Sequence, residues 1–401
     1  MGRHWLGSWD SLNMAALHLP SATGQLQAYE TGDAGSFSSA PGPFCRIAYA
    51  AAHVVADPLA ANDPWLTPAI DWERTIAYRE YLWSMGLGVA EAMDTAQRGT
   101  GLEWDCAREL IKRSVSAARA YGDATIASGC GTDHLVSASG NTLEDIQSAY
   151  ELQAEFIQAQ GGRLILMASR ALAASARSSD DYYRLYERLL AQVDEPVIIH
   201  WLGPMFDPAL AGYWGHDDLD EAMDVCLDVI RSHPNKVLGV KVSLLDKHRE
   251  IVMRRKLPSG VAMLSGDDFN YPELIEGDEQ GYSDALLGIF DVIAPAASAA
   301  LAALTIGQVE TYRKILEPTV ALSRHIFEAP TRFYKTGVVL MAYLNGLQDH
   351  FVMVGGQQSA RSVIHLSELF RLADRARLFH DPEDASDRMA RLLQTYGVSQ
   401  A

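Results

Sequence analysis

The sequence has few basic residues, few cysteines and no long apolar run, and each shortage excludes a class of protein. Its 401 residues include 33 Lys and Arg against 51 Asp and Glu, which gives a formal net charge of −18. This excess of negative charge repels polyanions, so we expect no nucleic-acid partner. No run approaches the roughly 18 apolar residues that span a bilayer, and the N-terminus lacks the apolar core of a signal peptide. We therefore expect a cytoplasmic protein with no membrane partner.

Cysteine pairs and glycine-rich phosphate loops are also missing. The four cysteines are scattered and form no CxxC pair, so neither a disulfide framework nor a zinc knuckle is indicated. No GxGxxG or Walker-type loop follows an apolar run, which removes the usual reason to expect an open, nucleotide-binding α/β sheet. The densest basic cluster, residues 247–256, is most simply an exposed helix face.

What the sequence does contain is a regular alternation of short apolar runs and longer segments of helical period. Eight strands separated by helices predict parallel pairing, and repeated right-handed crossovers close such a sheet into a (β/α)₈ TIM barrel, an α/β fold. An open doubly wound sheet is the structural alternative. The expected strands lie within residues 45–55, 87–93, 123–130, 163–169, 196–202, 237–245, 260–266 and 287–295. The expected intervening helices are 71–85, 103–121, 142–160, 180–193 and 219–232, with Thr142 and Asp145 as a capping start.

Three regions follow from this pattern. Residues 1–43 are rich in Gly, Ser and Pro and predict an irregular or hairpin-like N-terminal extension. Residues 44–298 hold the barrel. Residues 299–401 predict a C-terminal helical region packed on the barrel. Its helices are expected near 296–304, 309–327, 331–347 and 359–372.

Lys241 is the most unusual residue of the predicted strands. Side chains alternate along a strand, so Lys241 shares a face with Gly239 and Ser243, while Leu238, Val240 and Val242 take the apolar outer face. The lysine then points into the barrel near a strand's carboxyl end. Desolvation there lowers the pKa of the ammonium and frees an amine to attack a carbonyl carbon. A structural ion pair with an interior carboxylate, or a side chain that reaches the barrel rim, is the simpler alternative.

The order of several motifs resembles the dihydrodipicolinate synthase and N-acetylneuraminate lyase superfamily over residues 45–300. The likeness rests on AIDWERTIAYREYLWSMGLGVAEAM after the first run, on VLGVKVSLLD, on the S-G-D-D segment at 265–268 and on LGIFDVIAP. It is closest to a branch described only as a domain of unknown function. The resemblance implies a class I aldolase-type lyase without a cofactor, in which Lys241 forms a Schiff base with the substrate.

The departures from the family are informative. The second-strand loop, which reads G-T-T-G-E in the family and grips a substrate carboxylate, here reads Met93-Asp94-Thr95-Ala96-Gln97. Because Asp94 repels a carboxylate, we expect a keto-sugar or a sugar-derived 2-oxo acid rather than pyruvate in its standard pose. His200 stands where the family has a proton-relaying tyrosine, and its ordinary pKa of about 6.5 suits the same work.

The expected site therefore has two groups of residues. The expected catalytic residues are Lys241, His200, Asp94 and Thr95. The expected substrate-binding residues are Gln97, His134, Arg170, Ser243, Ser265, Gly266 and Asp267. His200 as a hydrogen-bonded core histidine and Asp94 as a scaffold partner of Lys241 or Arg98 are the simpler alternatives, while Trp201 is expected to pack outside. The expected partners are a small-molecule carbonyl substrate and copies of the same chain, as a dimer or tetramer.

Two other functions compete with the lyase. A metal-dependent sugar isomerase or epimerase could use Glu91, Asp94, Asp133, His134 and His200, which all fall near predicted strand ends. Against it, Glu91 and Asp94 are three residues apart on one strand and share a face only if a bulge intervenes. A non-catalytic ligand-binding barrel is the third possibility, since a fold does not guarantee a function.

Overall fold

The computed structural model of the protein describes residues 17–37, 41–122, 124–135 and 140–399. Eight parallel strands form a closed barrel in the order β10, β3, β4, β5, β6, β7, β8, β9. The barrel strands are β3 (Ala48–Ala51), β4 (Gly88–Glu91), β5 (Ile126–Cys130), β6 (Arg163–Leu166), β7 (Val197–Leu202), β8 (Val237–Ser243), β9 (Ala262–Ser265) and β10 (Asp284–Leu287). The predicted (β/α)₈ barrel is confirmed, and the open sheet is excluded.

Each barrel helix that the sequence predicted begins and ends close to the expected residues, whereas two short helices, Arg170–Ser175 and Tyr271–Glu276, were not predicted. The barrel helices are α1 (Trp72–Ser84), α2 (Trp104–Ala120), α3 (Leu143–Ala159), α4 (Arg170–Ser175), α5 (Ser179–Gln192), α6 (Leu219–Ser232), α7 (Lys247–Lys256) and α8 (Tyr271–Glu276). The capping box at the start of α3 is present: the Thr142 side chain accepts from the Asp145 backbone, and Asp145 accepts from that of Thr142.

The prediction of the eighth strand at residues 287–295 is wrong. Only Leu287 of this run belongs to a strand, because β10 lies just before the run. Most of the remaining residues form the short helix α9 (Ile289–Val292) and the start of α10 (Ala294–Thr305). All four residues of α9 are buried. An apolar run that is buried on all sides has no periodicity that separates a strand from a helix, which explains the error.

Alternation along the strands divides the core into two layers. Ile165, Ile198 and Leu264 belong to the cluster inside the barrel, whereas Val240 and Val242 belong to the larger cluster between the barrel and its helices. Trp201 also lies in this outer layer, where its ring meets Trp214 edge to face at 6.4 Å. The outward packing expected for Trp201 is therefore confirmed.

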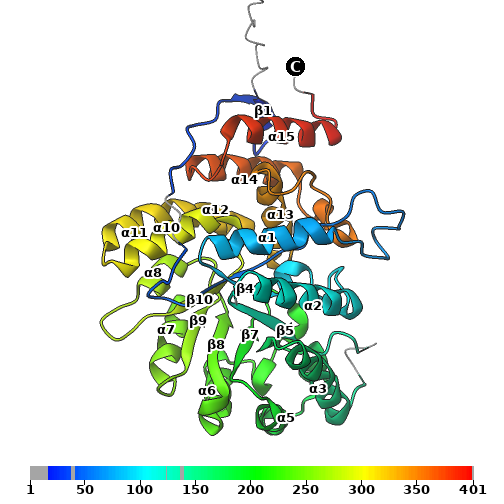
Figure 1. Ribbon diagram of the computed structural model, residues 1–401, viewed down its shortest axis with the longest axis vertical. Coiled ribbons are helices and arrows are strands. Elements are labelled where there is room, and N and C mark those ends of the chain that lie inside the picture. The colour runs from blue at the N-terminus through cyan, green and yellow to red at the C-terminus, as the bar shows by residue number, and fades with distance from the viewer. Residues whose placement is uncertain (1–16, 38–40, 123, 136–139, 400–401) are drawn as a thin grey trace, which may run out of the picture.

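The chain after the barrel is helical and lies over one end of it (Figure 1). Its elements are α11 (Val309–Leu316), α12 (Val320–Ile326), α13 (Tyr334–Leu344), α14 (Val363–Arg375) and α15 (Pro382–Thr395). The sequence did not predict α15, and the expected helix 309–327 is interrupted by a 3₁₀ turn, Glu317–Thr319, that contains a proline. Helix α13 contacts the Asp94–Ala96 turn that follows β4, so this region covers the carboxyl ends of the strands.

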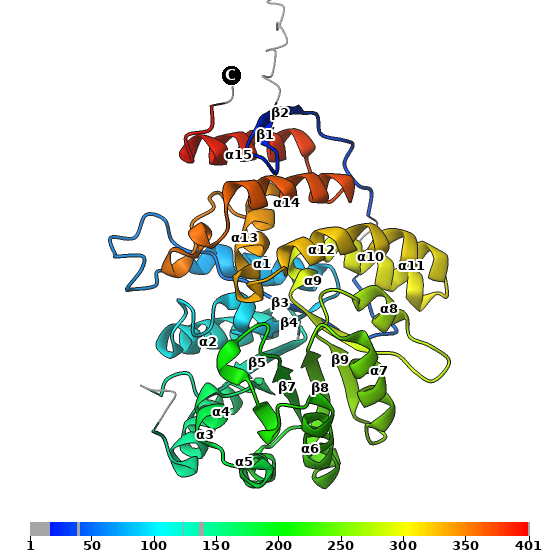
Figure 2. The same ribbon diagram turned by 180° about the vertical axis from the view of Figure 1, so that it is seen from behind.

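The beginning of the chain packs against its end. Strands β1 (Leu17–Pro20) and β2 (Leu26–Tyr29) form an antiparallel hairpin, as the sequence suggested, and β1 contacts α14 and α15. The Tyr29 hydroxyl donates to Asp374 Oδ2 at 2.7 Å, and Arg371 donates to the Pro20 carbonyl at 2.8 Å. Figure 2 shows this hairpin beside α14 and α15, beyond the barrel.

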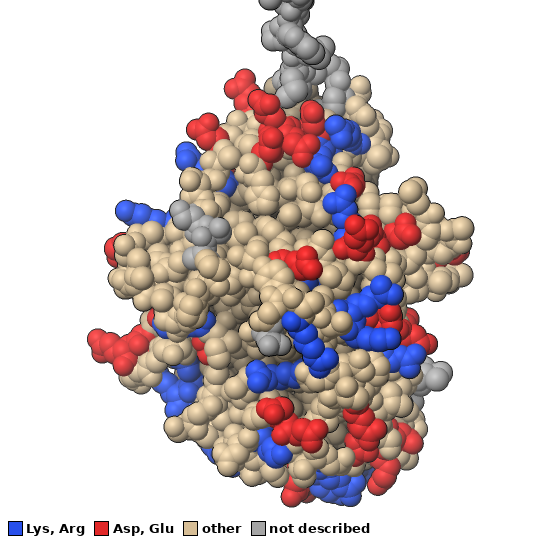
Figure 3. Space-filling model, in the orientation of Figure 1, with Lys and Arg blue, Asp and Glu red and all other residues tan. Residues whose placement is uncertain are grey.

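Acidic and basic side chains are intermingled on the face shown in Figure 3. The basic cluster on α7 is likewise paired with acids: Arg254 and Arg255 both reach Asp278, and Lys256 reaches Asp224. This pairing agrees with the simple interpretation of α7 as a charged helix face. In the part of the chain that the structure describes, no helix is long and apolar enough to cross a membrane.

Candidate functional site

Lys241 lies on the inner face of β8 near the carboxyl end of the strand. In the parallel register it is paired with His200 of β7 and Leu264 of β9. Its residue is 8% exposed. Among the described residues no hydrogen bond or ion pair is formed by its ammonium group. Burial lowers the pKa of Lys241, and the negative charges of Asp268 and Asp94 partly oppose that shift.

Gly266 leaves the space that the Lys241 side chain occupies. A Cβ at this position would lie 2.2 Å from Ser243 Oγ, 2.7 Å from the Val242 carbonyl and 2.9 Å from Lys241 Cε. Gly239 shares the inner face of β8, and a Cβ there would meet the Leu264 side chain at 2.8 Å. Leu264 therefore fills the space beside Gly239, and Ser243 and Gly266 pack closely against Lys241.

His200 is fully buried beside Lys241. Its Nε2 atom lies 3.3 Å from Ser243 Oγ, and its Nδ1 atom has no hydrogen-bond partner in the described structure. Burial, with a smaller effect from the positive charge of Lys241, lowers the pKa of His200 well below its ordinary value. The imidazole is therefore neutral at physiological pH and can both accept and donate a proton.

Asp268, rather than Asp267, is the aspartate after β9 whose charge acts on Lys241. Burial raises the pKa of Asp268 to about 7, and the charge of Lys241 lowers it in part. Its Oδ1 accepts from the Ile289 backbone at 2.8 Å. By contrast, Asp267 accepts from the Phe269 and Asn270 backbones at 2.9 and 3.0 Å and so shapes the loop after β9. The sequence placed two adjacent aspartates here, but the loop geometry decides which one acts on the amine.

Asp94 and Thr95 form the turn after β4, where the chain is 3₁₀-helical over Asp94–Ala96. Asp94 is partly exposed, whereas Thr95 is buried. The Thr95 Oγ1 atom lies 2.8 Å from the hydroxyl of Tyr334, which comes from α13. Tyr334 is buried, and burial together with the charge of Asp94 raises its pKa. A tyrosine of the C-terminal helices thus reaches the barrel mouth.

Lys335, next on α13, is a second buried lysine at the mouth. It is 5% exposed, and its ammonium lies 3.4 Å from Thr100 Oγ1. Burial lowers the pKa of Lys335, while the charge of Asp94 raises it and that of Arg170 lowers it. Tyr334 and Lys335 stand about 240 residues beyond Thr95 in sequence, so no local pattern predicts that they meet the turn after β4.

A cavity of about 900 Å³, open to solvent, lies at the carboxyl ends of β4 to β7. Its polar lining consists of Asp94, Arg98, Glu103, Thr132, Asp133, Ser169, Arg170, His200 and Asp207. Arg170 donates to Asp207 Oδ2 at 2.5 Å. Lys241 is not among the lining residues; the two lining residues that act on it are His200, beside it in the register, and Asp94.

The expected site residues are therefore only partly brought together. Lys241, His200, Asp94, Thr95, Ser243 and Gly266 lie around the inner end of the site, and Arg170 lies on the cavity wall. Ser265 points outward, because Leu264 takes the inner face, and donates to Glu250 Oε2 at 3.1 Å. The Gln97 amide donates to the Val354 carbonyl at 2.8 Å, and His134 Nδ1 accepts from Gln153 at 2.8 Å. Of the expected residues, Asp94, Arg170 and His200 line the cavity; the others do not, namely Lys241, Thr95, Gln97, His134, Ser243, Ser265, Gly266 and Asp267.

The carboxylates of the metal alternative are held by arginines. Glu91 accepts two hydrogen bonds of 2.9 Å from Arg79, with both side chains fully buried. Asp133 accepts two of 2.7 Å from Arg98. This structure therefore gives no support to a metal centre built on Glu91 and Asp133. Arg98, one of the two alternative scaffold partners of Asp94, pairs with Asp133 instead.

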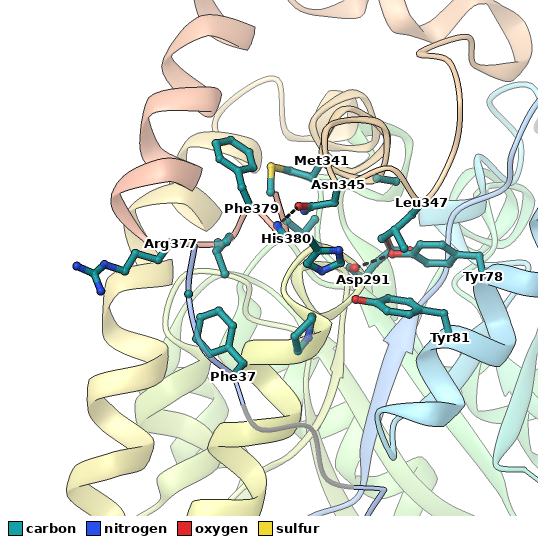
Figure 4. A pocket seen from close by; sticks show the side chains of 15 residues that line it. Phe37, Tyr78, Tyr81, Asp291, Met341, Asn345, Leu347, Arg377, Phe379 and His380 are labelled. Carbon is teal, nitrogen blue, oxygen red and sulfur yellow. Dashed lines mark hydrogen bonds between the residues drawn. The ribbon is translucent and has the colours of Figure 1, made fainter. Parts of the chain in front are cut away.

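A second hollow lies between α1, α13 and the segment before α15. It measures about 400 Å³, and Figure 4 shows Tyr78 directed at Asp291 inside it. The Asp291 carboxylate accepts from the Tyr78 hydroxyl at 2.8 Å and lies 3.0 Å from His53 Nδ1. Because these partners already satisfy the hydrogen-bonding capacity of Asp291, we interpret this hollow as part of the scaffold and not as a reactive site.

A family model described as "Protein of unknown function (DUF993)" matches residues 17–398, nearly the whole chain. The chain belongs to the DUF993 family. No curated protein matches it. The resemblance to a domain-of-unknown-function branch is thus confirmed, and the family description assigns no activity.

Solved structures resemble the DUF993 chain in fold. A 4-hydroxy-tetrahydrodipicolinate synthase from Methylacidiphilum fumariolicum SolV matches with a TM-score of 0.62 and 15% identity, over 86% of this chain and 98% of that one. A prophage protein of the dihydrodipicolinic acid synthase family from Escherichia coli, solved in complex with pyruvate, matches with a TM-score of 0.61 and 12% identity, over 88% and 99%. The dihydrodipicolinate synthase from Aquifex aeolicus gives 0.57 and 14%, over 88% and 98%. At such identities the likeness is one of fold.

Proposed function

We propose that the protein is a Schiff-base-forming lyase or aldolase, with Lys241 as the nucleophile. The single observation that carries the proposal is an inward-facing lysine without an ion pair among the described residues, buried beside a neutral histidine. A buried ammonium without a carboxylate partner loses its proton more readily, and the free amine is the nucleophile. The fold shared with dihydrodipicolinate synthases agrees with this chemistry but does not establish it.

The surrounding groups fit the proton transfers that imine formation requires. The Lys241 nitrogen attacks the ketone carbon, and the carbinolamine then loses its hydroxyl as water. Asp268, whose pKa burial raises to about 7, can supply the proton for that water. The iminium withdraws electrons from the neighbouring bond, so cleavage, condensation or dehydration becomes accessible. Asp94 and His200 line the cavity and are placed to move the substrate's proton.

The charges of the cavity favour a polyhydroxylated ketone or a sugar-derived 2-oxo acid. The carboxylate of Asp94 lines the cavity near the proposed nucleophile. It would repel a substrate carboxylate placed there, and it can accept hydrogen bonds from substrate hydroxyl groups. Arg170 and Lys335 both lie near the Gly99–Thr100 turn: a Cβ at Gly99 would lie 3.5 Å from Arg170 Nη1, and Lys335 donates to Thr100. These two cations suit an anionic group at the far end of the substrate.

We also propose that the protein acts as a cytoplasmic homo-oligomer, a dimer or tetramer. The loop between β3 and α1 exposes three large apolar side chains: Leu59, Trp65 and Leu66 are 92%, 71% and 75% exposed. Such a group is typical of a surface that another chain covers, and we assign it to a second copy. Sedimentation of the wild type and of the double variant Trp65→Ser, Leu66→Ser tests this: we expect dissociation in the variant, and a monomeric wild type contradicts the assignment.

Reductive trapping tests the lyase proposal. The full chain is incubated with dihydroxyacetone, dihydroxyacetone phosphate or pyruvate in the presence of borohydride, and its intact mass is measured. We expect the mass to rise by one reduced adduct with at least one of the two sugar-type ketones. The same treatment of Lys241→Met is expected to leave the mass unchanged. An unchanged wild-type mass with all three ketones argues against the mechanism.

A further inference from the structure

The junction of α12 and α14, outside the barrel cavity, contains two histidines and a glutamate that converge. One possible ligand atom from each of His325, Glu328 and His365 lies within 4.8 Å of the other two. Over the described ranges of the chain, no other group of three such side chains meets that condition. The proposed function uses none of these residues.

The hydrogen bond made by His325 leaves its other nitrogen ready to bind a cation. Its Nε2 atom lies 2.9 Å from the His365 carbonyl oxygen, which only accepts, so Nε2 carries the hydrogen. In the neutral ring, Nδ1 then holds a lone pair, and it lies 3.7 Å from Glu328 Oε2. Histidines that bind metals are commonly oriented by such a bond from the second nitrogen to a backbone carbonyl.

His365 turns its Nδ1 atom to the same carboxylate. Nδ1 lies 2.9 Å from Glu328 Oε1, and the ring stacks on that of His325 with centroids 4.0 Å apart. A carboxylate only accepts, so a proton on Nδ1 bridges this contact in the metal-free protein. A divalent ion bound there would take the tautomer of His365 that carries its hydrogen on Nε2, an atom with no partner in the described structure, and would then accept the lone pairs of both Nδ1 atoms.

The backbone around the three residues is held before any ion binds. Arg361, just before α14, donates to the Glu328 carbonyl at 2.6 Å and to the Pro330 carbonyl at 3.2 Å. The Ser362 side chain caps α14 by accepting from the His365 backbone at 3.2 Å. These bonds fix the loop that carries Glu328 against the start of α14, so only small side-chain rotations separate the present arrangement from a coordinated one.

We propose that His325, Glu328 and His365 form a binding site for a divalent first-row transition ion such as Zn²⁺. Two imidazoles and one carboxylate are a ligand set that such ions accept, with a fourth position left to water on the exposed side of Glu328. The ion would stabilise the segment between α12 and α13, because Phe327 in that segment stacks on Tyr334 of α13 with ring centroids 4.4 Å apart.

The test uses the full chain without an affinity tag, treated with EDTA and dialysed. Titration calorimetry with Zn²⁺ is expected to give one site per chain, and Co²⁺ to give the visible absorption of a nitrogen-ligated ion. Glu328→Gln and His325→Gln should weaken binding by about tenfold or more. His248→Gln, an exposed histidine on α7, is the matched control and should bind as the wild type does.

Thermal unfolding gives a second readout that a misfolded variant cannot imitate. Zn²⁺ should raise the melting temperature of the wild type and of His248→Gln, because an ion that binds the folded chain stabilises it. At the same Zn²⁺ concentration it should raise the melting temperature of Glu328→Gln by clearly less, and this substitution of a half-exposed side chain is expected to keep the fold. The proposal is overturned if the wild type binds no Zn²⁺, or if Glu328→Gln and His325→Gln bind and respond as the wild type does.

Discussion

On one side of the barrel mouth buried charges are paired, and on the other they are not. On the β3 and β4 side, Arg79 meets Glu91 through two hydrogen bonds of 2.9 Å, and His53 meets Asp291 at 3.0 Å. On the β7 and β8 side, Lys241 has no ion pair within the described residues, and His200 keeps one nitrogen without a partner there. All of these residues are buried, with exposures between 0% and 8%, so burial alone does not explain the contrast.

The difference separates scaffold from reactive groups. A buried ion pair whose hydrogen bonds are complete holds its members in one charge state, and removal of either member leaves an unpaired charge. A buried amine with no partner can give up its proton, which costs stability but provides a nucleophile. The β3 and β4 side should therefore respond to substitution through stability, and the β7 and β8 side through reactivity.

The largest expected effect is on the reactive side. Lys241→Met removes the amine but keeps an unbranched apolar chain, so adduct formation should fall by about 10⁴-fold or more. The melting temperature should stay the same or rise, since a desolvated charge is removed. Trapping by mass spectrometry and thermal unfolding measure the two effects, with the exposed Lys112→Met as the control. A variant that unfolds would place Lys241 in the scaffold.

The counterpart on the paired side is Glu91→Gln. It leaves the Arg79 guanidinium buried without a compensating charge, which should lower the free energy of unfolding by about 3–5 kcal/mol. Denaturant titration measures the loss. If Glu91→Gln keeps its stability but loses adduct formation, the proposed difference between a structural β3 and β4 side and a reactive β7 and β8 side is wrong.

The third prediction concerns the cation supplied by α13. Lys335→Gln should weaken the trapping of dihydroxyacetone phosphate by about tenfold, the effect of one charged hydrogen bond, and leave that of dihydroxyacetone nearly unchanged. The ratio of the ketone concentrations that give half-maximal trapping measures this. If both ketones weaken equally, Lys335 shapes the site without contacting the anionic group.

The fourth prediction is a pH dependence of stability at Asp268. Burial raises the pKa of Asp268 from 3.8 to about 7. Between these two pH values the folded chain therefore binds more protons than the unfolded chain. The stability contribution of the protonated acid is lost as the pH rises through about 7. Asp268→Asn cannot ionise, so its melting temperature relative to the wild type should rise from pH 4 to pH 8. A difference that is flat with pH would mean that Asp268 ionises normally in the folded chain.

The sequence predicted what depends on local pattern. Alternation on β8 correctly placed Val240 and Val242 outside the barrel, but it was wrong for Leu238, which packs against the inner cluster where the β7–β8 register shifts. The capping start at Thr142 was correct because both of its bonds are local. The same alternation, applied to β9, would have turned Ser265 outward once Leu264 was placed inside; the likeness to the family's S-G-D-D segment overrode it.

What the sequence could not predict depends on contacts between distant segments. Tyr334 and Lys335 reach the site because α13 lies over the barrel mouth, and nothing near them in the chain records the presence of Thr95 or Thr100. The pairing of Glu91 with Arg79 was missed for a related reason: Arg79 is one of several charged residues on α1, and only the packing of that helix on β4 shows that it is buried.

The most direct test of the central claim is to find which lysine carries the trapped adduct. Lys241 and Lys335 are both buried, and burial lowers the pKa of both. Peptide mapping of the wild-type chain after borohydride treatment with dihydroxyacetone should place the whole modification on Lys241 and none on Lys335. An adduct on Lys335, with Lys241 unmodified, would contradict the account.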